Sequence, residues 1–357
     1  MFSKGIKRVC PFITILFILI FVMTGCLSSA SGEYDRNIFA LDTIITFKVI
    51  GNRSAKKAME KAIERIHEIE DHMSATIDES DVSRINTMAG QEPVAVNEDT
   101  FYVIEKALEY GKLTDGIFDI TIGPIVNLWN IGSDNPKVPS EEDIEDRLLL
   151  VDYRKVIIDK NKKTVFLEDK GMKIDLGAIA KGYAADEALR ILKEAGVKHA
   201  LLNLGGNVLV IGGKPDGKPW RIGLQDPRTE ETGHEHFAIA EVEDRTIVSS
   251  GDYERYMVDI YEKTGIRYHH IFHPENGYPA ESGLMTCTII GDSSMDADAI
   301  STIFFIMGYE KGFQFIEGLE GVEAIAVTLD KQVYTTKGLE DKLIPSNDHY
   351  RIRGSGK

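Results

Sequence analysis

The stretch KIDLGAIAKGYAAD, residues 173–186, decides how the middle of this chain folds. Its first residues are typical of a buried strand, Gly177 allows a tight turn, and the following alanine-rich segment predicts a helix that ends at Gly196. The turn and the helix N-terminus bring free backbone N–H groups beside the carboxylate of Asp175 and the ammonium of Lys181. This arrangement is typical of a phosphate-binding site, although a plain structural turn has the same pattern.

Composition and charge indicate a globular protein that does not bind nucleic acid. The 357 residues are enough for one large or two modest domains, and 43% of them are apolar. A net charge of −16 would repel the phosphates of DNA or RNA. An anionic small ligand would therefore need a local cation or a bound metal ion.

The N-terminus has the features of a lipoprotein signal. A basic start precedes an apolar run at residues 12–23, which is too short for a comfortable membrane span. Cys26 follows a Thr-Gly pair, as in a lipobox, whose cysteine carries diacylglycerol and palmitate. We predict a signal peptide at 1–25, a lipid anchor and tether at 26–36, and a location on the extracytoplasmic face of the cell membrane. A retained membrane anchor and simple secretion are the alternatives.

Only one cysteine remains in the predicted folded body. Cys287 lies in an apolar strand pattern at residues 285–290, so we expect a buried, unreactive thiol. An exported protein with a single body cysteine has no internal disulfide, so its stability must come from its apolar core.

Apolar periodicity and capping residues predict the other elements. We expect strands at 44–50, 155–159, 164–167, 199–204, 208–211, 220–225, 238–242, 246–249 and 285–290. We expect helices that begin near Ser54, Asn97, Ser140 and Ser293, the last of which ends at Gly308. Residues 74–90 and 114–129 are predicted to be loops.

The loop at 114–129 contains many hydrogen-bonding side chains and little charge. Such side chains are costly to bury without partners, which favours a wall of a ligand site. A structural turn packed by Phe118 and Trp129 is the alternative.

Three histidines gather at residues 268–280. Adjacent residues of a strand point to opposite faces, so His269 and His270 cannot easily bind one metal ion. One histidine that acts as an acid, a base or a phosphate donor is the better interpretation. A strand histidine bonded to the backbone remains the alternative.

Asp298 and Thr302 are four residues apart on the helix that begins near Ser293, hence on one face. A carboxylate and a hydroxyl are ligands that Mg²⁺ accepts, with its other positions left for substrate phosphates. Ordinary surface polarity would also explain this pair.

Taken together, these segments resemble one family, the FAD:protein FMN transferases or ApbE-type flavin transferases, over about residues 38–335. The resemblance rests on short motifs that occur in the family's order. They are MS at 73, SRIN at 83, TDG at 114, FD at 118, GP at 123, NLW at 127, DLGAIAKGYA at 175, NLGGN at 203, SG at 250, YERY at 253, HHI at 269, ADA at 297 and ST at 301.

The resemblance implies an α+β fold and a group transfer. The fold would be a compact ApbE-like, T-fold-related domain at 37–345, with mixed sheets and a flavin-binding cleft between two lobes, followed by a flexible tail at 346–357. The reaction would move FMN from the substrate FAD to a Thr or Ser hydroxyl of an acceptor redox protein, with Mg²⁺ on the pyrophosphate and AMP leaving.

The resemblance also implies roles for single residues. Mg²⁺ would bind the carbonyl of Ala178 together with Asp298 and Thr302. His270 would lie near the transferred phosphate as the candidate base, with Asp298 as the second candidate. FAD would contact Leu41, Thr76, Ile117, Phe118, Asp119, Asp175, Lys181 and Ile271.

The chain departs from the family pattern at two places. Leu41-Asp42-Thr43 stands where the family has Met-Gly-Thr, and Thr76 stands where many relatives have a tyrosine that packs on the flavin nucleotide. A small residue at 76 would leave FAD more open to water, so hydrolysis to FMN and AMP would compete with transfer. A magnesium-dependent FAD pyrophosphatase and a non-catalytic flavin-binding lipoprotein are therefore the alternative functions.

Overall fold

The computed structural model describes residues 32–133, 135–340 and 342–355. The predicted signal peptide and Cys26 lie outside these residues. No helix in the described ranges is long and apolar enough to cross a membrane.

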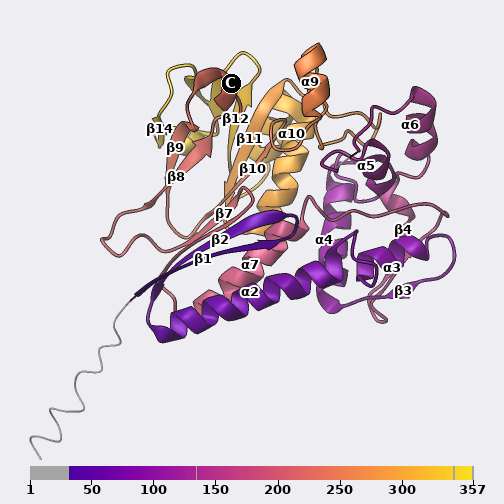
Figure 1. Ribbon diagram of the computed structural model, residues 1–357, viewed down its shortest axis with the longest axis horizontal. Coiled ribbons are helices and arrows are strands. Elements are labelled where there is room, and N and C mark those ends of the chain that lie inside the picture. The colour runs from indigo at the N-terminus through magenta and orange to yellow at the C-terminus, as the bar shows by residue number, and fades with distance from the viewer. Residues whose placement is uncertain (1–31, 134, 341, 356–357) are drawn as a thin grey trace, which may run out of the picture.

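A nine-stranded sheet is the frame of the fold (Figure 1). Its order is β1-β2-β6-β7-β10-β11-β12-β13-β15, and neighbouring strands are antiparallel except β13 and β15. The strands are β1 (Gly32–Ala40), β2 (Thr43–Gly51), β6 (His199–Leu204), β7 (Asn207–Ile211), β10 (Thr246–Gly251), β11 (Leu284–Gly291), β12 (Glu323–Thr328), β13 (Gln332–Thr335) and β15 (Arg351–Ser355).

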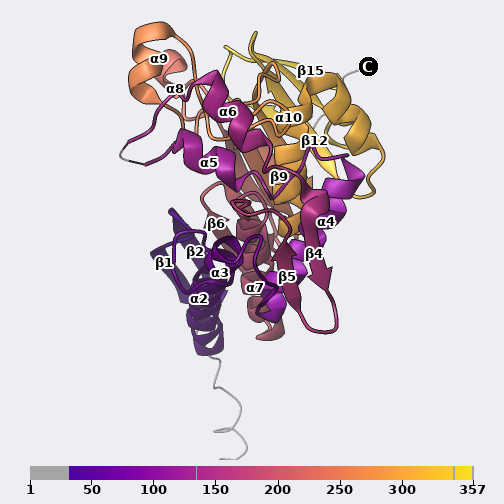
Figure 2. The ribbon, with the colours of Figure 1, turned by 90° about the vertical axis from the view of Figure 1, so that its right-hand side faces the viewer.

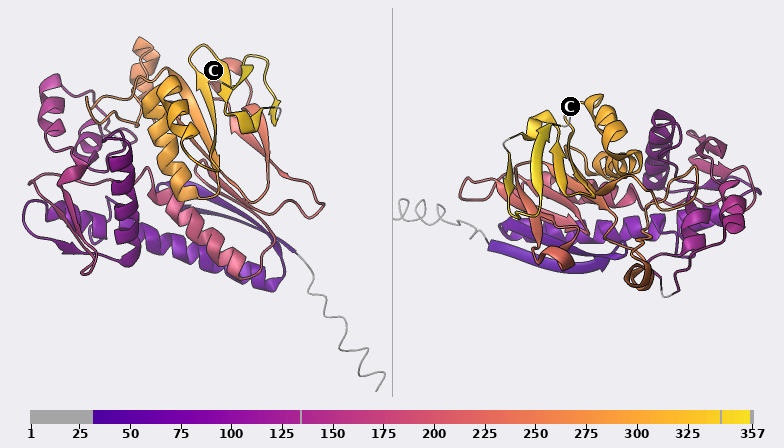
Figure 3. Two further views of the ribbon diagram at one scale, coloured as in Figure 1. Left: turned by 180° about the vertical axis from the view of Figure 1, so that it is seen from behind. Right: turned by 90° about the horizontal axis from the view of Figure 1, so that it is seen from above.

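Three long helices, α2 (Arg53–Met73), α7 (Ala180–Glu194) and α10 (Ser294–Glu317), cover one face of this sheet, as the view from behind in Figure 3 shows. One apolar face of α2 is buried, with Ile66 and Ile69 fully inaccessible to solvent. Helix α10 is buried on most sides, because it packs against both α7 and the central strands. The main apolar core therefore lies between the helices and the sheet.

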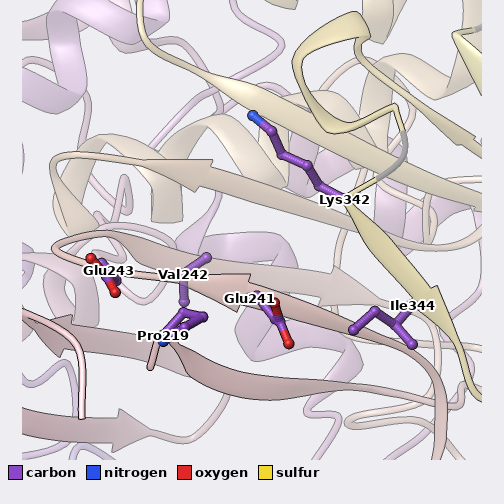
Figure 4. A pocket seen from close by; sticks show the side chains of 6 residues that line it. All are labelled: Pro219, Glu241, Val242, Glu243, Lys342 and Ile344. Carbon is purple, nitrogen blue, oxygen red and sulfur yellow. The ribbon is translucent and has the colours of Figure 1, made fainter. Parts of the chain in front are cut away.

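A three-stranded sheet packs on the opposite face of the large sheet. It contains β8 (Trp220–Gln225), β9 (His236–Val242) and β14 (Leu343–Pro345). Side chains such as Ile222 and Phe237 form a second apolar core with Ile247 and Ile325 of the large sheet. A shallow groove opens at the edge of the small sheet, between Glu241 and Ile344 (Figure 4), and none of the predicted site residues lines it.

Seven of the remaining elements form a mainly helical part beside the large sheet (Figures 1 and 2), whereas the short helices α8 (Thr229–Thr232) and α9 (Val258–Thr264) lie in connections outside it. The seven are α3 (Asp81–Thr87), α4 (Glu98–Leu113), α5 (Gly123–Trp129), α6 (Glu141–Leu148), β3 (Val94–Ala95), β4 (Val156–Asp159) and β5 (Thr164–Leu167). The indole N–H of Trp129 donates to the carbonyl of Gly277 at 2.8 Å, which joins α5 to the histidine-containing segment. The predicted α+β class with several sheets is confirmed.

Both predicted terminal segments contain strands of the large sheet. Gly32–Ala40 forms edge strand β1, so the tether predicted at 26–36 already includes sheet residues. The tail predicted at 346–357 contains β15, which pairs in parallel with β13. Tyr350 is buried and its hydroxyl donates to Asp226, which explains why this segment is attached to the domain.

Three predicted element boundaries are wrong. The loop at 74–90 contains α3, capped by Ser80, and the loop at 114–129 ends in α5, which has a proline in its first turn. Helix α10 does not stop at Gly308, which has a φ of 77° and forms a kink. The helix resumes because Phe313 and Ile316 bury their side chains in the main core.

Helices α7 and α10 approach unusually closely at Gly182. A Cβ atom at this position would lie 2.2 Å from the carbonyl oxygen of Ser294. The carboxylate of Asp186 on α7 accepts hydrogen bonds from the backbone N–H groups of Ser294 and Met295 at 2.8 and 3.0 Å, which caps α10. This crossing sets the position of every residue on the first turns of both helices.

We predict that Gly182→Ala pushes the two helices apart. The added methyl group has no space, so the free energy of unfolding should fall by about 1–3 kcal/mol. Urea unfolding followed by circular dichroism measures this change. Gly291→Ala is the matched control, because a Cβ there meets no atom within 4 Å. Equal stability of Gly182→Ala and Gly291→Ala would contradict the prediction.

Candidate functional site

The helix crossing brings Asp298 against the N-terminus of α7. One carboxylate oxygen of Asp298 accepts the backbone N–H of Gly182 at 2.9 Å, and the other lies 3.4 Å from the ammonium of Lys181. Asp298 is only 4% exposed. Because the Gly182 N–H donates to Asp298, no backbone N–H of the described residues donates to the carbonyl of Ala178.

This arrangement fits an oxygen-ligated cation. The carbonyl of Ala178 lacks a donor, and the hydroxyl of Thr302, one helical turn after Asp298, has no hydrogen-bond partner within the described ranges. A carbonyl, a carboxylate and a hydroxyl match the preference of Mg²⁺ and leave positions for substrate oxygens. Across the part of the chain that is described, no three His, Cys, Asp or Glu side chains gather as a transition-metal site would need.

Asp175 and Lys181 lie at the same turn. Asp175 accepts the N–H of Gly177 at 2.7 Å, and its own N–H donates to the carbonyl of Ile120 at 2.8 Å. The ammonium of Lys181 also lies 3.3 Å from the carbonyl of Gly177. Burial raises the pKa of Asp175, and the Gly177 N–H and the Lys181 charge oppose this shift. The structure therefore brings Asp175, Lys181 and Asp298 together.

The loop at 117–119 uses its side chains within the protein. One oxygen of Asp119 accepts the N–H and hydroxyl of Thr121 at 2.8 and 2.6 Å, and the other accepts the N–H of Tyr153 at 2.9 Å. Burial raises the pKa of Asp119, and these three donors oppose the shift. Phe118 is buried with its ring against Tyr110, and Ile117 is half-buried. Phe118 and Asp119 thus hold the loop in shape, and their predicted contacts with FAD stay a prediction.

The two adjacent histidines have different surroundings. His269 is buried, with Nε2 3.2 Å from the carbonyl of Ala280 and its ring against Phe305. The N–H of His270 donates to the carbonyl of Arg255 at 3.1 Å, and its Nδ1 lies 3.3 Å from the same oxygen. Burial lowers the pKa of His270 to about 3, so its ring is neutral at pH 7. A proton on Nδ1 would leave Nε2 free to accept one.

Sequence reasoning missed two charged residues of this site, Glu254 and Arg255, in the loop after β10. The Oε1 atom of Glu254 lies 3.6 Å from where a Cβ on Gly206 would be. Burial among protein atoms raises the pKa of Glu254 to about 7, and the charge of Lys181 opposes that shift while that of Asp298 adds to it. Solvent still reaches its side chain. Charged residues directly after a buried strand were the available signal in the sequence.

The other predicted FAD contacts lie around this group. Leu41 and Asp42 form the tip of the β1–β2 hairpin, with φ values of 53° and 55°, and the carbonyl of Asp42 accepts from Arg255 at 3.0 Å. Ile271 follows His270 and is buried. Thr76 is exposed, and its hydroxyl lies 3.0 Å from that of Ser74. The structure links Leu41 and Ile271 to the site through Arg255 and His270, whereas Thr76 is hydrogen-bonded to the nearby Ser74.

Comparison with known proteins gives a consistent result. The model of the ApbE family matches residues 41–326. The chain is 33% identical to the FAD:protein FMN transferase of Treponema pallidum (strain Nichols), covering 87% of this chain and 89% of that protein. It is 36% identical to an FAD:protein FMN transferase of Klebsiella pneumoniae (strain 342), covering 82% and 89%.

Solved structures agree with the sequence comparison. The crystal structure of the ApbE protein of Thermotoga maritima superposes with a TM-score of 0.78 at 34% identity, covering 87% of this chain and 99% of that one. The flavin transferase ApbE from Vibrio cholerae superposes with a TM-score of 0.77 at 26% identity, with the same coverage.

We predict a pH-dependent stability effect of Glu254. Its pKa rises from 4.5 in the unfolded chain to about 7 in the folded one, so the stabilisation from its protonated form is present below pH 4.5 and is lost as pH rises through about 7. Glu254→Gln keeps a neutral side chain, so its melting temperature should exceed that of the natural protein more at about pH 8 than at about pH 5. Differential scanning calorimetry without ligand measures this. Glu92→Gln, in the turn that follows α3, is the control, and the same difference at both pH values in Glu254→Gln would refute the prediction.

Proposed function

Because this chain belongs to the ApbE family, we propose that it transfers FMN from FAD to a Thr or Ser hydroxyl of an acceptor protein, with Mg²⁺ bound and AMP released. The observation that carries the proposal is the contact of Asp298 with Gly182 and Lys181. This contact brings the Asp298 carboxylate to the α7 turn that carries Ala178, whose carbonyl has no backbone donor among the described residues. The Asp298 carboxylate on α10 and the Ala178 carbonyl before α7 can thereby supply oxygen ligands to a cation that binds a pyrophosphate.

The proposed step forms one bond and breaks one bond. The acceptor hydroxyl oxygen bonds to the phosphorus of the FMN half, the bond from that phosphorus to the bridging oxygen breaks, and AMP leaves with the bridging oxygen. When bound, Mg²⁺ supplies positive charge to the phosphate oxygens. Lys181 adds a second cation beside them, held by Asp298 and the Gly177 carbonyl.

The hydroxyl proton goes to Nε2 of His270 in this proposal. The ring is neutral, and the Arg255 carbonyl lies where it can accept a hydrogen bond from a protonated Nδ1, which leaves Nε2 as the proton acceptor. Its low pKa makes it a weak base in the free protein. The negative charge of bound FAD would raise that pKa and make the transfer easier.

Hydrolysis of FAD is the second candidate function, because Thr76 is small and exposed. If water replaces the acceptor hydroxyl, the same bond breaks and free FMN and AMP result. Incubation with FAD, Mg²⁺ and an exported redox protein separates the functions. Fluorescence on the acceptor in a denaturing gel supports transfer, AMP without it supports hydrolysis, and stoichiometric FAD binding without AMP supports a non-catalytic protein.

We further propose that the protein acts at the outer face of the cell membrane, held by lipid on Cys26. The basic start, the short apolar run and the position of Cys26 in the sequence support this location. Acceptors would then be membrane or exported redox proteins.

We predict that Asp298→Asn and Thr302→Val impair turnover differently. Asparagine can still accept the Gly182 N–H but lacks the charge, so AMP release should fall by about 100-fold or more. Thr302→Val removes one oxygen ligand at constant shape, so it should mainly raise the Mg²⁺ concentration needed for half-maximal rate, and Thr302→Ser should restore it. Chromatographic assay of AMP against Mg²⁺ concentration measures both. Full activity of Asp298→Asn would exclude the proposed metal site.

We predict that Cys26→Ala moves the protein from the membrane fraction to the soluble exported fraction. Removing the thiol removes the site of lipid attachment, whereas the folded body is unchanged. Cell fractionation with immunoblotting measures the distribution, and Cys10→Ala is the control. Persistent membrane association of Cys26→Ala would indicate a retained anchor.

A further inference from the structure

Arg255 reaches across two segments that border the candidate site. Its backbone carbonyl accepts the N–H of His270 at 3.1 Å, so the main chain of Arg255 is fixed beside the proposed base. Its side chain passes Gly132, where an added Cβ would lie 3.6 Å from the Arg255 Cδ atom. The guanidinium then donates to the carbonyl of Asp42 at 3.0 Å, at the tip of the β1–β2 hairpin.

The positive charge of Arg255 influences the pKa values of three titratable groups of the candidate site. Burial raises the pKa of Asp175 and of Glu254, and the charge of Arg255 opposes part of both shifts; burial lowers the pKa of His270, and the charge of Arg255 adds to that shift. Yet within the described ranges no carboxylate comes within ion-pair distance of Arg255, and the Asp42 carbonyl is the one acceptor of its side chain.

Arg255 thus has free hydrogen-bond donors in a site that must hold a double phosphate. A guanidinium has five N–H donors in a planar fork, which suits two phosphate oxygens at once. Lys181, the other cation, is already shared with Asp298 and the Gly177 carbonyl. A second cation without a carboxylate partner would offset the repulsion between the pyrophosphate and the acidic groups nearby.

We propose that Arg255 is a substrate-binding residue whose guanidinium holds the pyrophosphate of FAD. The inference rests on the proposed function for the identity of the ligand, but it concerns binding and does not need turnover. The contact with the Asp42 carbonyl positions the guanidinium before the substrate arrives. Arg255 would then contribute to affinity for phosphate-bearing flavins and not to affinity for the flavin ring.

The test measures equilibrium binding of FAD and of riboflavin, which has the ring but no phosphate. Flavin fluorescence is followed in a chelating buffer without Mg²⁺. Arg255→Gln keeps a donor for the Asp42 carbonyl but removes the charge, so its Kd for FAD should rise by about 10- to 100-fold. Arg255→Lys should show a smaller rise, because it keeps the charge without the fork. Riboflavin affinity should be unchanged in both variants.

Arg53→Gln is the matched control, because it removes the same charge from an exposed position beyond the far end of β2, roughly 25–30 Å along the strand from the hairpin tip. Equal loss of FAD and riboflavin affinity in Arg255→Gln would mean that Arg255 only holds the hairpin, and would overturn the proposal. Unchanged FAD affinity with a higher KM for the acceptor would assign Arg255 to the acceptor instead. Failure of the natural protein to flavinylate acceptors, with FAD binding intact, would refute the proposed function alone.

Discussion

The hydrogen bond from the Gly182 N–H to the Asp298 carboxylate is the contact on which the candidate site depends. Residue 182 must be glycine for α10 to come close enough, and the capping of α10 by Asp186 fixes the same approach from the next turn. A buried carboxylate without donors would be costly, so the protein supplies one backbone donor and one ammonium. The same contact takes away the donor that a regular helix would give to the Ala178 carbonyl. One packing constraint thus creates two of the proposed metal ligands.

The charges around this contact suit a doubly charged ligand in an otherwise acidic protein. Asp175, Glu254 and Asp298 would repel a pyrophosphate, and Lys181 and Arg255 offset only part of that repulsion. In the proposed reaction a divalent cation would remove the remainder, which would let a carboxylate at the helix crossing serve a phosphate site. Desolvation by neighbouring protein atoms raises the pKa of both Asp175 and Glu254, although solvent reaches the Glu254 side chain, and the charge of Lys181 opposes both shifts.

The sequence predicted those parts of the fold that local patterns determine. The turn at Gly177, helix α7 and strands such as β5 and β6 follow from periodicity and glycine, and Asp298 and Thr302 follow from helical spacing. The features that the sequence did not predict depend on contacts between residues that are far apart in the chain. Strand β15 exists because it pairs with β13, and the tail is anchored by Tyr350 on Asp226. Asp119 holds its loop in shape through a hydrogen bond from Tyr153, which lies 34 residues away in the sequence. Arg255 contacts Asp42 and His270, and no local sequence pattern connects these three residues.

The surroundings of His270 bear on how the proposed reaction would be ordered. A ring that is neutral because burial and neighbouring cations disfavour its charge is a poor base while the site contains no substrate. The phosphates of FAD would neutralise Lys181 and Arg255, the same cations that lower its pKa, so binding of FAD itself would increase the basicity of Nε2. Proton removal from the acceptor hydroxyl would then become effective only after FAD is in place. Such an order would keep the histidine inactive until the phosphorus that the hydroxyl must attack is present.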